Sequence, residues 1–175
     1  MRGRVLTSKV RAGVRPTSSR VREALFSMLG QDLSDVTVLD GFGGSGLISF
    51  EAMSRGAEVT TVERNRPAAA AIQSNAEHLK VKMDLRITDL RNVLASGQWD
   101  VVILDPPYAD DPVEWVAEAS ACVREVLVIE HKSGASLPEQ VGALIQDVSR
   151  RYGDSSLTIY RRGSDPSLEE ADVVP

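Results

Sequence analysis

The sequence has few of the residues from which metal centres and disulfide frameworks are built. Among its 175 residues there is one cysteine, Cys122, and there are two histidines, His78 and His131. A single cysteine cannot form an intrachain disulfide, and neither histidine has HExxH-like spacing or a cluster of ligands beside it. We therefore expect no bound metal, and we expect Cys122 to be a packed thiol in the core.

Long apolar runs are also missing. No uninterrupted apolar stretch is long enough to cross a bilayer, and Met1-Arg2-Gly3-Arg4 is not followed by the apolar region of a signal peptide. Hydrophobic residues still make up 42% of the chain, which is typical of globular domains. We therefore expect a cytoplasmic protein with one folded domain, no membrane contact and no internal repeat.

Charge is unevenly distributed along the chain. The net charge of −5 argues against a nucleic-acid partner if it is taken as an average. Residues 1–22 contain no acidic side chain, however, and residues 163–175 contain no basic one. The first segment is either an RNA-binding arm or a solvated basic tail, and the last is most simply a disordered, solubilising end. The basic residues of the first segment are Arg2, Arg4, Lys9, Arg11, Arg15, Arg20 and Arg22.

Apolar strands and helices alternate along most of the sequence. A helix-start signal at Pro16-Thr17-Ser18-Ser19 predicts an amphipathic helix that ends at Gly30. Because regular alternation of this kind builds a buried parallel sheet with helices on both faces, we expect an α/β fold. Strands are predicted at 36–40, 58–63, 85–88, 101–105 and 125–130, and helices or turns at 47–54, 67–80, 90–95 and 112–122.

The end of the chain breaks this alternation. Residues 145–151 and 156–160 flank Tyr152-Gly153-Asp154-Ser155, which predicts an antiparallel hairpin. We accordingly divide the chain into a basic arm and helix at 1–30, a main domain at 31–162 and an acidic tail at 163–175.

The most informative motif is Asp105-Pro106-Pro107-Tyr108, directly after an apolar run. Two consecutive prolines lack backbone N–H donors and fix φ, so this loop offers acceptors in a rigid frame. The Asp105 carboxylate and the Pro106 carbonyl could hold the hydrogens of an exocyclic amine, and Tyr108 offers a face on which a base could stack. The motif predicts methyl transfer to an amine nitrogen, although it could also be a simple turn at the end of a strand.

A glycine-rich loop, Asp40-Gly41-Phe42-Gly43-Gly44-Ser45-Gly46, follows the first strand of the main domain and opens a helix. Its GxGxxG spacing, with Glu63 further on, fits a dinucleotide or S-adenosylmethionine. The carboxylate of Asp40 would repel a pyrophosphate but suits the ammonium end of a methionyl group. Glu63 could accept from two ribose hydroxyls. Asp89 could accept from the adenine amine, or it could instead cap a helix.

Five spaced motifs occur in the order found in one known family. They are Arg15–Leu29, the Asp40 loop running into Leu47–Gly56, Val62-Glu63, Asp105–Tyr108 and Tyr152-Gly153-Asp154. Together they resemble the RsmD-type bacterial methyltransferases of small-subunit rRNA over residues 2–162. Asp-Pro-Pro-Tyr alone would be shared with DNA adenine methyltransferases.

This resemblance implies a seven-stranded, Rossmann-like class I methyltransferase sheet, mostly parallel with a C-terminal antiparallel hairpin. It implies an enzyme that uses S-adenosylmethionine to methylate the exocyclic 2-amino group of a guanine in small-subunit rRNA or its assembling ribonucleoprotein. We separately expect a monomer. The base would lie against Asp105, Pro106, Pro107 and Tyr108, and the RNA against Lys9, Arg11, Arg15, Arg20 and Arg22. Cofactor contacts would come from Asp40, Gly41, Phe42, Gly43, Gly46, Glu63, Arg64, Asp89, Leu90 and Thr17.

Three other functions compete with this interpretation. Adenine methylation in DNA or RNA uses the same loop chemistry, but in DNA it would need recognition residues for which this chain has little room. A non-catalytic nucleotide-binding or RNA-binding module is disfavoured by the intact Asp-Pro-Pro-Tyr motif. An NAD-dependent oxidoreductase is disfavoured because no Ser/Tyr/Lys or histidine-based proton-transfer set stands out.

Overall fold

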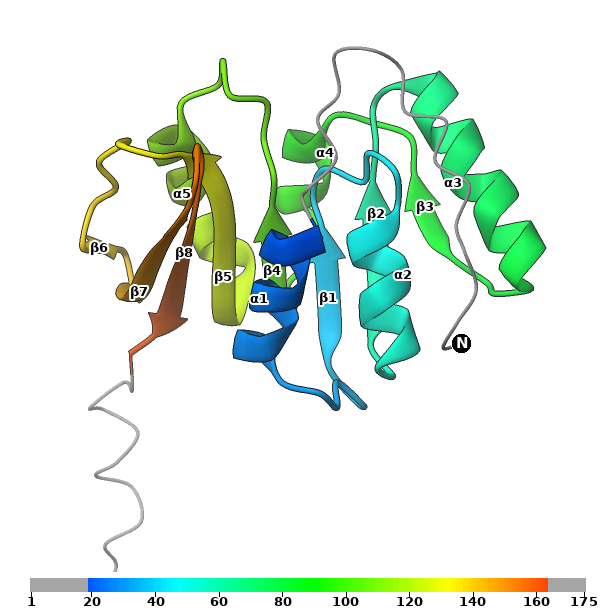
Figure 1. Cartoon of the computed structure of the whole chain (residues 1–175), viewed down its shortest axis with the longest axis horizontal. Helices are drawn as coiled ribbons and strands as arrows, with labels where there is room; N and C mark the ends of the chain where they lie inside the picture. The colour runs from blue at the N-terminus through cyan, green and yellow to red at the C-terminus, as the bar shows by residue number, and fades with distance from the viewer. Residues whose placement is uncertain (1–18, 164–175) are drawn as a thin grey trace, which may run out of the picture.

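Eight strands form one sheet in the computed structural model, which describes residues 19–163 (Figure 1). Their order across the sheet is β3-β2-β1-β4-β5-β8-β7-β6. The strands are β1 (Thr37–Asp40), β2 (Glu58–Val62), β3 (Asp84–Arg86), β4 (Trp99–Leu104), β5 (Val123–Lys132), β6 (Gln140–Val141), β7 (Leu144–Tyr152) and β8 (Ser155–Arg162).

The first five strands are parallel and the last three are antiparallel to their neighbours. β8 lies between β5 and β7 and pairs antiparallel with both, and β7 pairs antiparallel with β6. The predicted combination of a mostly parallel sheet and a C-terminal antiparallel hairpin is therefore confirmed. The predicted number of strands is one too low, because β6 adds a short strand at the edge. Its two residues, Gln140 and Val141, are too few to show a period of two in the sequence.

Helices cover both faces of the sheet. Helices α1, α2 and α3 lie on one face, where α1 and α2 share a hydrophobic cluster and α3 packs beside α2. Helices α4 and α5 cover the other face. Their bounds are α1 (Ser19–Leu29), α2 (Leu47–Ser54), α3 (Arg66–Leu79), α4 (Leu90–Leu94) and α5 (Pro112–Ala119), followed by a 3-10 turn, η1 (Ser120–Cys122).

Alternation along the strands divides the core into these two layers. On β1, Val38 faces α1 and α2, whereas Leu39 faces α4 and α5, and both are fully buried. On β5, Val128 and Ile129 alternate in the same way. Cys122 is a buried thiol at the end of η1, as predicted, and burial raises its pKa to about 11.

The first helix is part of this core. Val21, Leu25 and Phe26 of α1 are at most 2% exposed. Arg55, after α2, places its guanidinium 4.7 Å from the centre of the Phe26 ring and donates to the carbonyl of Gly30. Residues 19–29 thus pack with the sheet.

Four residues of the predicted site, Lys9, Arg11, Arg15 and Thr17, lie outside the described residues, as does nearly all of the acidic tail. No helix within residues 19–163 has both the length and the hydropathy needed to cross a bilayer.

Candidate active site

Four acidic residues stand at or just beyond the carboxyl ends of four adjacent parallel strands. Asp40 ends β1, Glu63 follows β2, Asp105 follows β4, and Asp89 stands beyond β3 at the start of α4. Parallel strands end at the same edge of a sheet, which is the upper edge in Figure 1, so the fold brings these four residues to one edge. β1 lies between β2 and β4, where the strand order reverses, and ligands of open α/β sheets bind at such a point.

The glycine loop is held against both neighbouring strands. The N–H of Gly41 donates to the carbonyl of Ile103 on β4 at 2.9 Å, and that of Gly43 donates to the carbonyl of Val62 on β2 at 2.8 Å. Gly46 has φ +78°, a left-handed conformation that favours glycine, and a Cβ there would approach the Phe50 ring to 2.8 Å. The loop therefore depends on a glycine at position 46 to enter α2.

Glu63 links the glycine loop to the next helix. One carboxylate oxygen accepts from the N–H of Gly44 at 2.8 Å, and the other accepts from the N–H of Asn65 at 2.6 Å. Asn65 in turn caps α3 by accepting from Ala68. A carboxylate has about four acceptor positions, so Glu63 keeps acceptor capacity for further hydroxyl donors.

Asp40 is buried under the loop, with only 1% of its surface exposed. The Ser49 hydroxyl donates to its carboxylate at 2.6 Å and lies 2.7 Å from the hydroxyl of Thr61. Burial raises the pKa of Asp40 to about 6, the hydrogen bond from Ser49 opposes that shift, and the negative charge of Asp105 adds to it. A cation placed above the loop would lower this pKa again.

Asp89 caps α4, since its carboxylate accepts from the N–H of Arg91 at 3.0 Å. The same carboxylate lies 3.8 Å from Arg64, whose side chain is 69% exposed. Leu90 is only 4% exposed and packs in the core, so only its backbone could face a ligand. Phe42 on the glycine loop meets the Trp115 ring edge to face, with the ring centres 5.1 Å apart.

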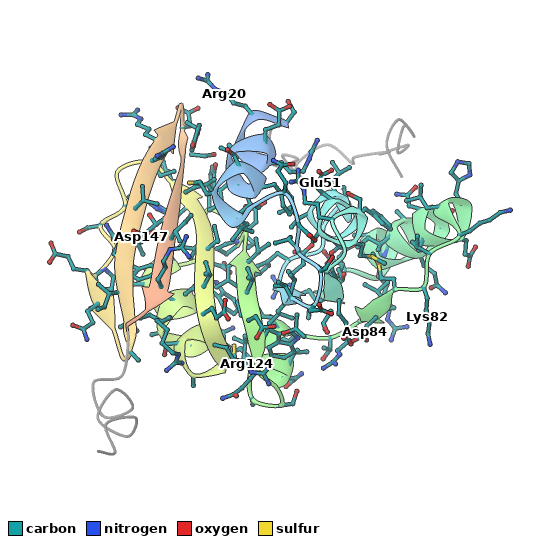
Figure 2. All side chains as sticks on the ribbon, turned by 90° about the horizontal axis from the view of Figure 1, so that it is seen from below. Arg20, Glu51, Lys82, Asp84, Arg124 and Asp147 are labelled. Atoms are coloured by element: carbon teal, nitrogen blue, oxygen red, sulfur yellow. The ribbon has the colours of Figure 1, made fainter. Side chains whose placement is uncertain are left out.

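The basic residues of α1 contribute nothing to the lining of the cavity described below. Arg20 is exposed and projects outward from the helix in Figure 2, and Arg22 is partly buried.

Within residues 19–163 no group of three or more His, Cys, Asp or Glu side chains is arranged to hold a metal ion.

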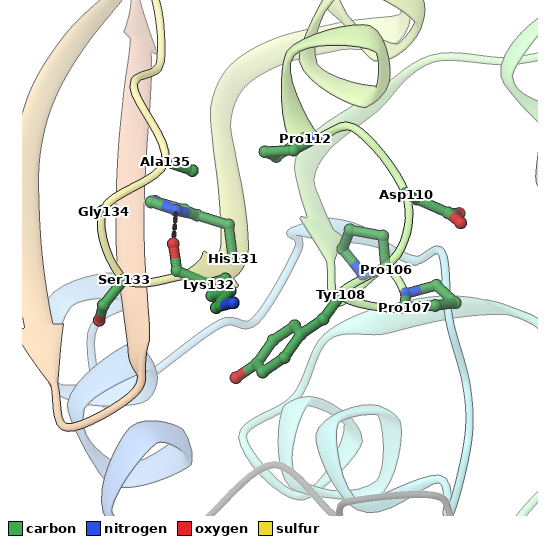
Figure 3. Close-up of a pocket in the computed structure, with 10 residues that line it drawn as sticks. All are labelled: Pro106, Pro107, Tyr108, Asp110, Pro112, His131, Lys132, Ser133, Gly134 and Ala135. Atoms are coloured by element: carbon green, nitrogen blue, oxygen red, sulfur yellow. Dashed lines mark hydrogen bonds between the residues drawn. The ribbon is translucent and has the colours of Figure 1, made fainter.

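Pro106, Pro107 and Tyr108 of the Asp-Pro-Pro-Tyr motif line one wall of a cavity of about 370 Å³, whereas Asp105 is not among its lining residues (Figure 3). The residues on this wall are Pro106, Pro107, Tyr108, Asp110 and Pro112. The opposite wall is the segment from His131 to Ala135, at the end of β5 and beyond it. Tyr108 is 42% exposed and its hydroxyl bonds the Ser155 hydroxyl at the start of β8.

The second wall was not predicted as part of the site. His131 is 5% exposed; its Nδ1 lies 3.1 Å from the carbonyl of Lys132, and its Nε2 lies 2.8 Å from the hydroxyl of Thr158. This pattern suits a neutral ring that donates at Nδ1 and accepts at Nε2, and burial lowers the pKa of His131 accordingly. The signal that could have indicated this wall was the strand predicted at 125–130, because the segment after it lies at the same sheet edge as Asp105.

Comparisons with known proteins agree with this architecture. A family profile described as Conserved hypothetical protein 95 matches residues 1–161. The Bacillus subtilis protein YlbH is 29% identical over 92% of this chain and 95% of its own length. The ribosomal RNA small subunit methyltransferase D of Haemophilus influenzae is 36% identical over 61% of this chain, but the match spans only 60% of that protein.

Solved structures share the fold. A hypothetical protein of Thermus thermophilus superposes with a TM-score of 0.76 at 29% identity, over 90% of this chain and 93% of the other. Methyltransferases from Geobacter sulfurreducens and Agrobacterium tumefaciens have the same fold, with TM-scores of 0.65 and 0.62 at 12% and 17% identity. The sheet is therefore that of class I methyltransferases, and the chain belongs to the Conserved hypothetical protein 95 family, the RsmD-type family that its motifs predicted.

Proposed function

We propose that this protein transfers a methyl group from S-adenosylmethionine to the exocyclic 2-amino group of a guanine in small-subunit rRNA. The family and the fold support methyl transfer to rRNA. The choice of a guanine amine rests on the acceptor chemistry of the Asp105–Tyr108 loop and on the family resemblance.

The residues around the glycine loop fit S-adenosylmethionine. Glu63 has acceptor capacity for two ribose hydroxyls, and the backbone at Gly44 is open, since a Cβ there would meet only the carbonyl of Phe42 at 3.7 Å. The buried charge of Asp40 favours a cationic ligand because a nearby positive charge offsets the desolvation of its carboxylate. Asp89 and Arg64 stand at the strand edge where the adenine would lie.

The cofactor supplies an activated methyl group on a sulfonium with a neutral leaving group, so the protein's task is alignment and exclusion of water. The Asp105 carboxylate and the Pro106 carbonyl accept the two hydrogens of the amine and direct its lone pair toward the glycine loop. After the new N–C bond forms and the S–C bond breaks, Asp105 accepts the proton that the nitrogen releases. Tyr108 holds the base by stacking.

The observation that carries this proposal is the short separation between the glycine loop and Asp105. Asp105 is close enough to Asp40 for its charge to raise the pKa of that residue. Gly41, the first glycine of the loop, donates its N–H to the carbonyl of Ile103, two residues before Asp105. A methyl group held at the glycine loop would therefore lie beside an amine held at Asp105.

The test is methylation of small ribosomal subunits purified from a strain that lacks this protein. The purified protein and labelled S-adenosylmethionine should transfer one methyl group, and nuclease digestion with mass spectrometry should identify it as 2-methylguanosine. Label recovered as methyladenosine would replace the guanine assignment by adenine methylation, and no transfer to either free rRNA or subunits would overturn the proposal.

A further inference from the structure

A hydrogen bond joins the acceptor loop to a distant hairpin. The hydroxyl of Tyr108 bonds the hydroxyl of Ser155, which is 47 residues away in the chain. Ser155 is the first residue of β8 and pairs with Lys132, a residue of the second cavity wall. Ser155 is 5% exposed, whereas Tyr108 is 42% exposed. The bond therefore joins a buried residue to a side chain that lines the cavity.

The turn that carries Ser155 is itself anchored. The N–H of Ser133 donates to the carbonyl of Asp154 at 2.8 Å, and the Ser133 hydroxyl donates to the carbonyl of Gly153 at 3.0 Å. The hydroxyls of Ser133 and Ser156 lie 3.1 Å apart. These bonds attach the β7–β8 turn to the end of β5, so Ser155 has a defined position relative to the second wall.

The bond to Ser155 can fix the orientation of the Tyr108 ring, which the backbone of Tyr108 alone does not determine. The prolines before it fix the backbone but leave its own side-chain torsions free. A half-exposed ring that rotates would present its face to a base for only part of the time. A bond at the phenol oxygen, at the far end of the side chain, restricts both torsions at once.

We propose that Ser155 is a positioning residue that orients Tyr108 for the target base, so that the β7–β8 turn belongs functionally to the base-binding site. This inference rests on the proposed function, in which Tyr108 stacks on the base. The bond acts on the alignment of the bound base, so its removal should lower kcat more than it raises KM.

The test is a double-mutant cycle with Ser155→Ala and Tyr108→Phe, assayed for methyl transfer to subunits from the strain lacking the protein. Each single change removes one partner of the same bond and should lower kcat by roughly three- to tenfold, the effect of one ordinary hydrogen bond. The double variant should be no slower than either single one, because the bond can be removed only once. Ser155→Thr keeps a hydroxyl and should restore most of the rate.

Ser156→Ala is the matched control. Ser156 is the next residue in β8, is 7% exposed, and bonds Ser133 instead of Tyr108. The turn keeps its two other bonds from Ser133 in that variant. Its kcat should stay within about twofold of the parent value, even where its melting temperature falls as much as that of Ser155→Ala.

The outcomes separate this inference from the function on which it rests. The positioning role would be overturned if the fold-losses in kcat of the two single variants multiply in the double variant. It would also be overturned if both single variants have the parent's rate while Tyr108→Ala is severely impaired. Either result leaves the proposed function intact. A Tyr108→Ala variant with the parent's rate would overturn the stacking step itself, and the role of Ser155 with it.

Discussion

Replacing Asp40 by asparagine should stabilise the free protein and weaken its binding of S-adenosylmethionine. The carboxyl has a pKa of about 6 in the folded protein against an ordinary value of 3.8, because burial disfavours its charged form. The folded state therefore binds more protons than the unfolded state between about pH 4 and pH 6. The free energy of unfolding falls as the pH rises through that window.

The size of this effect follows from the shift. A difference of about two pKa units corresponds to about 3 kcal/mol of stability lost above pH 6. Asparagine has no charge to bury and can still accept from the Ser49 hydroxyl. The backbone N–H groups of Phe42 and Ser49, which lower the pKa of Asp40, would favour an amide less than a carboxylate, so we expect a net gain of about 1–2 kcal/mol at about pH 7.5.

Urea unfolding of the parent and Asp40→Asn proteins at several pH values between about 4.5 and 7.5 measures this directly. The difference in unfolding free energy should grow with pH in favour of the variant and level off above about pH 6. Taking the difference removes the contributions of other carboxyls, such as Asp100, whose pKa is lowered by the hydroxyl of Thr37. A difference that is constant across this range would refute the reasoning, as would tighter cofactor binding by the variant in calorimetry.

Three further predictions concern the ligands. Asp105→Ala should abolish methyl transfer yet keep cofactor affinity in calorimetry within a few-fold; turnover near the parent rate would remove Asp105 from catalysis. Glu63→Ala should weaken S-adenosylmethionine binding in calorimetry by about 1–3 kcal/mol, because the ribose hydroxyls lose a charged acceptor. S-adenosylmethionine should raise the melting temperature of the parent protein, and NAD should not. Deleting residues 1–14 should make the slope of log affinity against log salt concentration shallower on an rRNA hairpin, by about 0.7–0.9 for each phosphate contact that is lost. Circular dichroism checks that both proteins are folded. An unchanged slope would mean that residues 1–14 are a solvated arm that does not bind RNA.

Much of the fold and of the site followed from local patterns in the sequence. The alternation of strands and helices defined the parallel sheet, and its strand ends put Asp40, Glu63, Asp89 and Asp105 on one edge. The prediction of the strand ends succeeded because connections between parallel strands are short and of one hand, so that few arrangements of the strands are possible. Of the two roles that the sequence left open for Asp89, the structure shows the cap of α4, and acceptance from the adenine amine stays a prediction.

The features that were missed depend on contacts between distant segments. The bond between Tyr108 and Ser155 requires the pairing of β5 with β8, and the wall from His131 to Ala135 requires the pairing of β4 with β5. No short motif encodes either pairing. The depth of burial of Asp40 depends in the same way on packing by α2 and β2. Side-chain environment therefore had to come from the structure.

The position of β8 also bears on how this protein is made. It is the last strand within residues 19–163, yet it lies between β5 and β7, so β5 has no partner on that side until residues 155–162 have been synthesised. The glycine loop and Asp105 belong to strands that pair without it. A nascent chain can thus pair the strands of the cofactor half first, whereas the bond that holds Tyr108 can form only after residues 155–162 have left the ribosome.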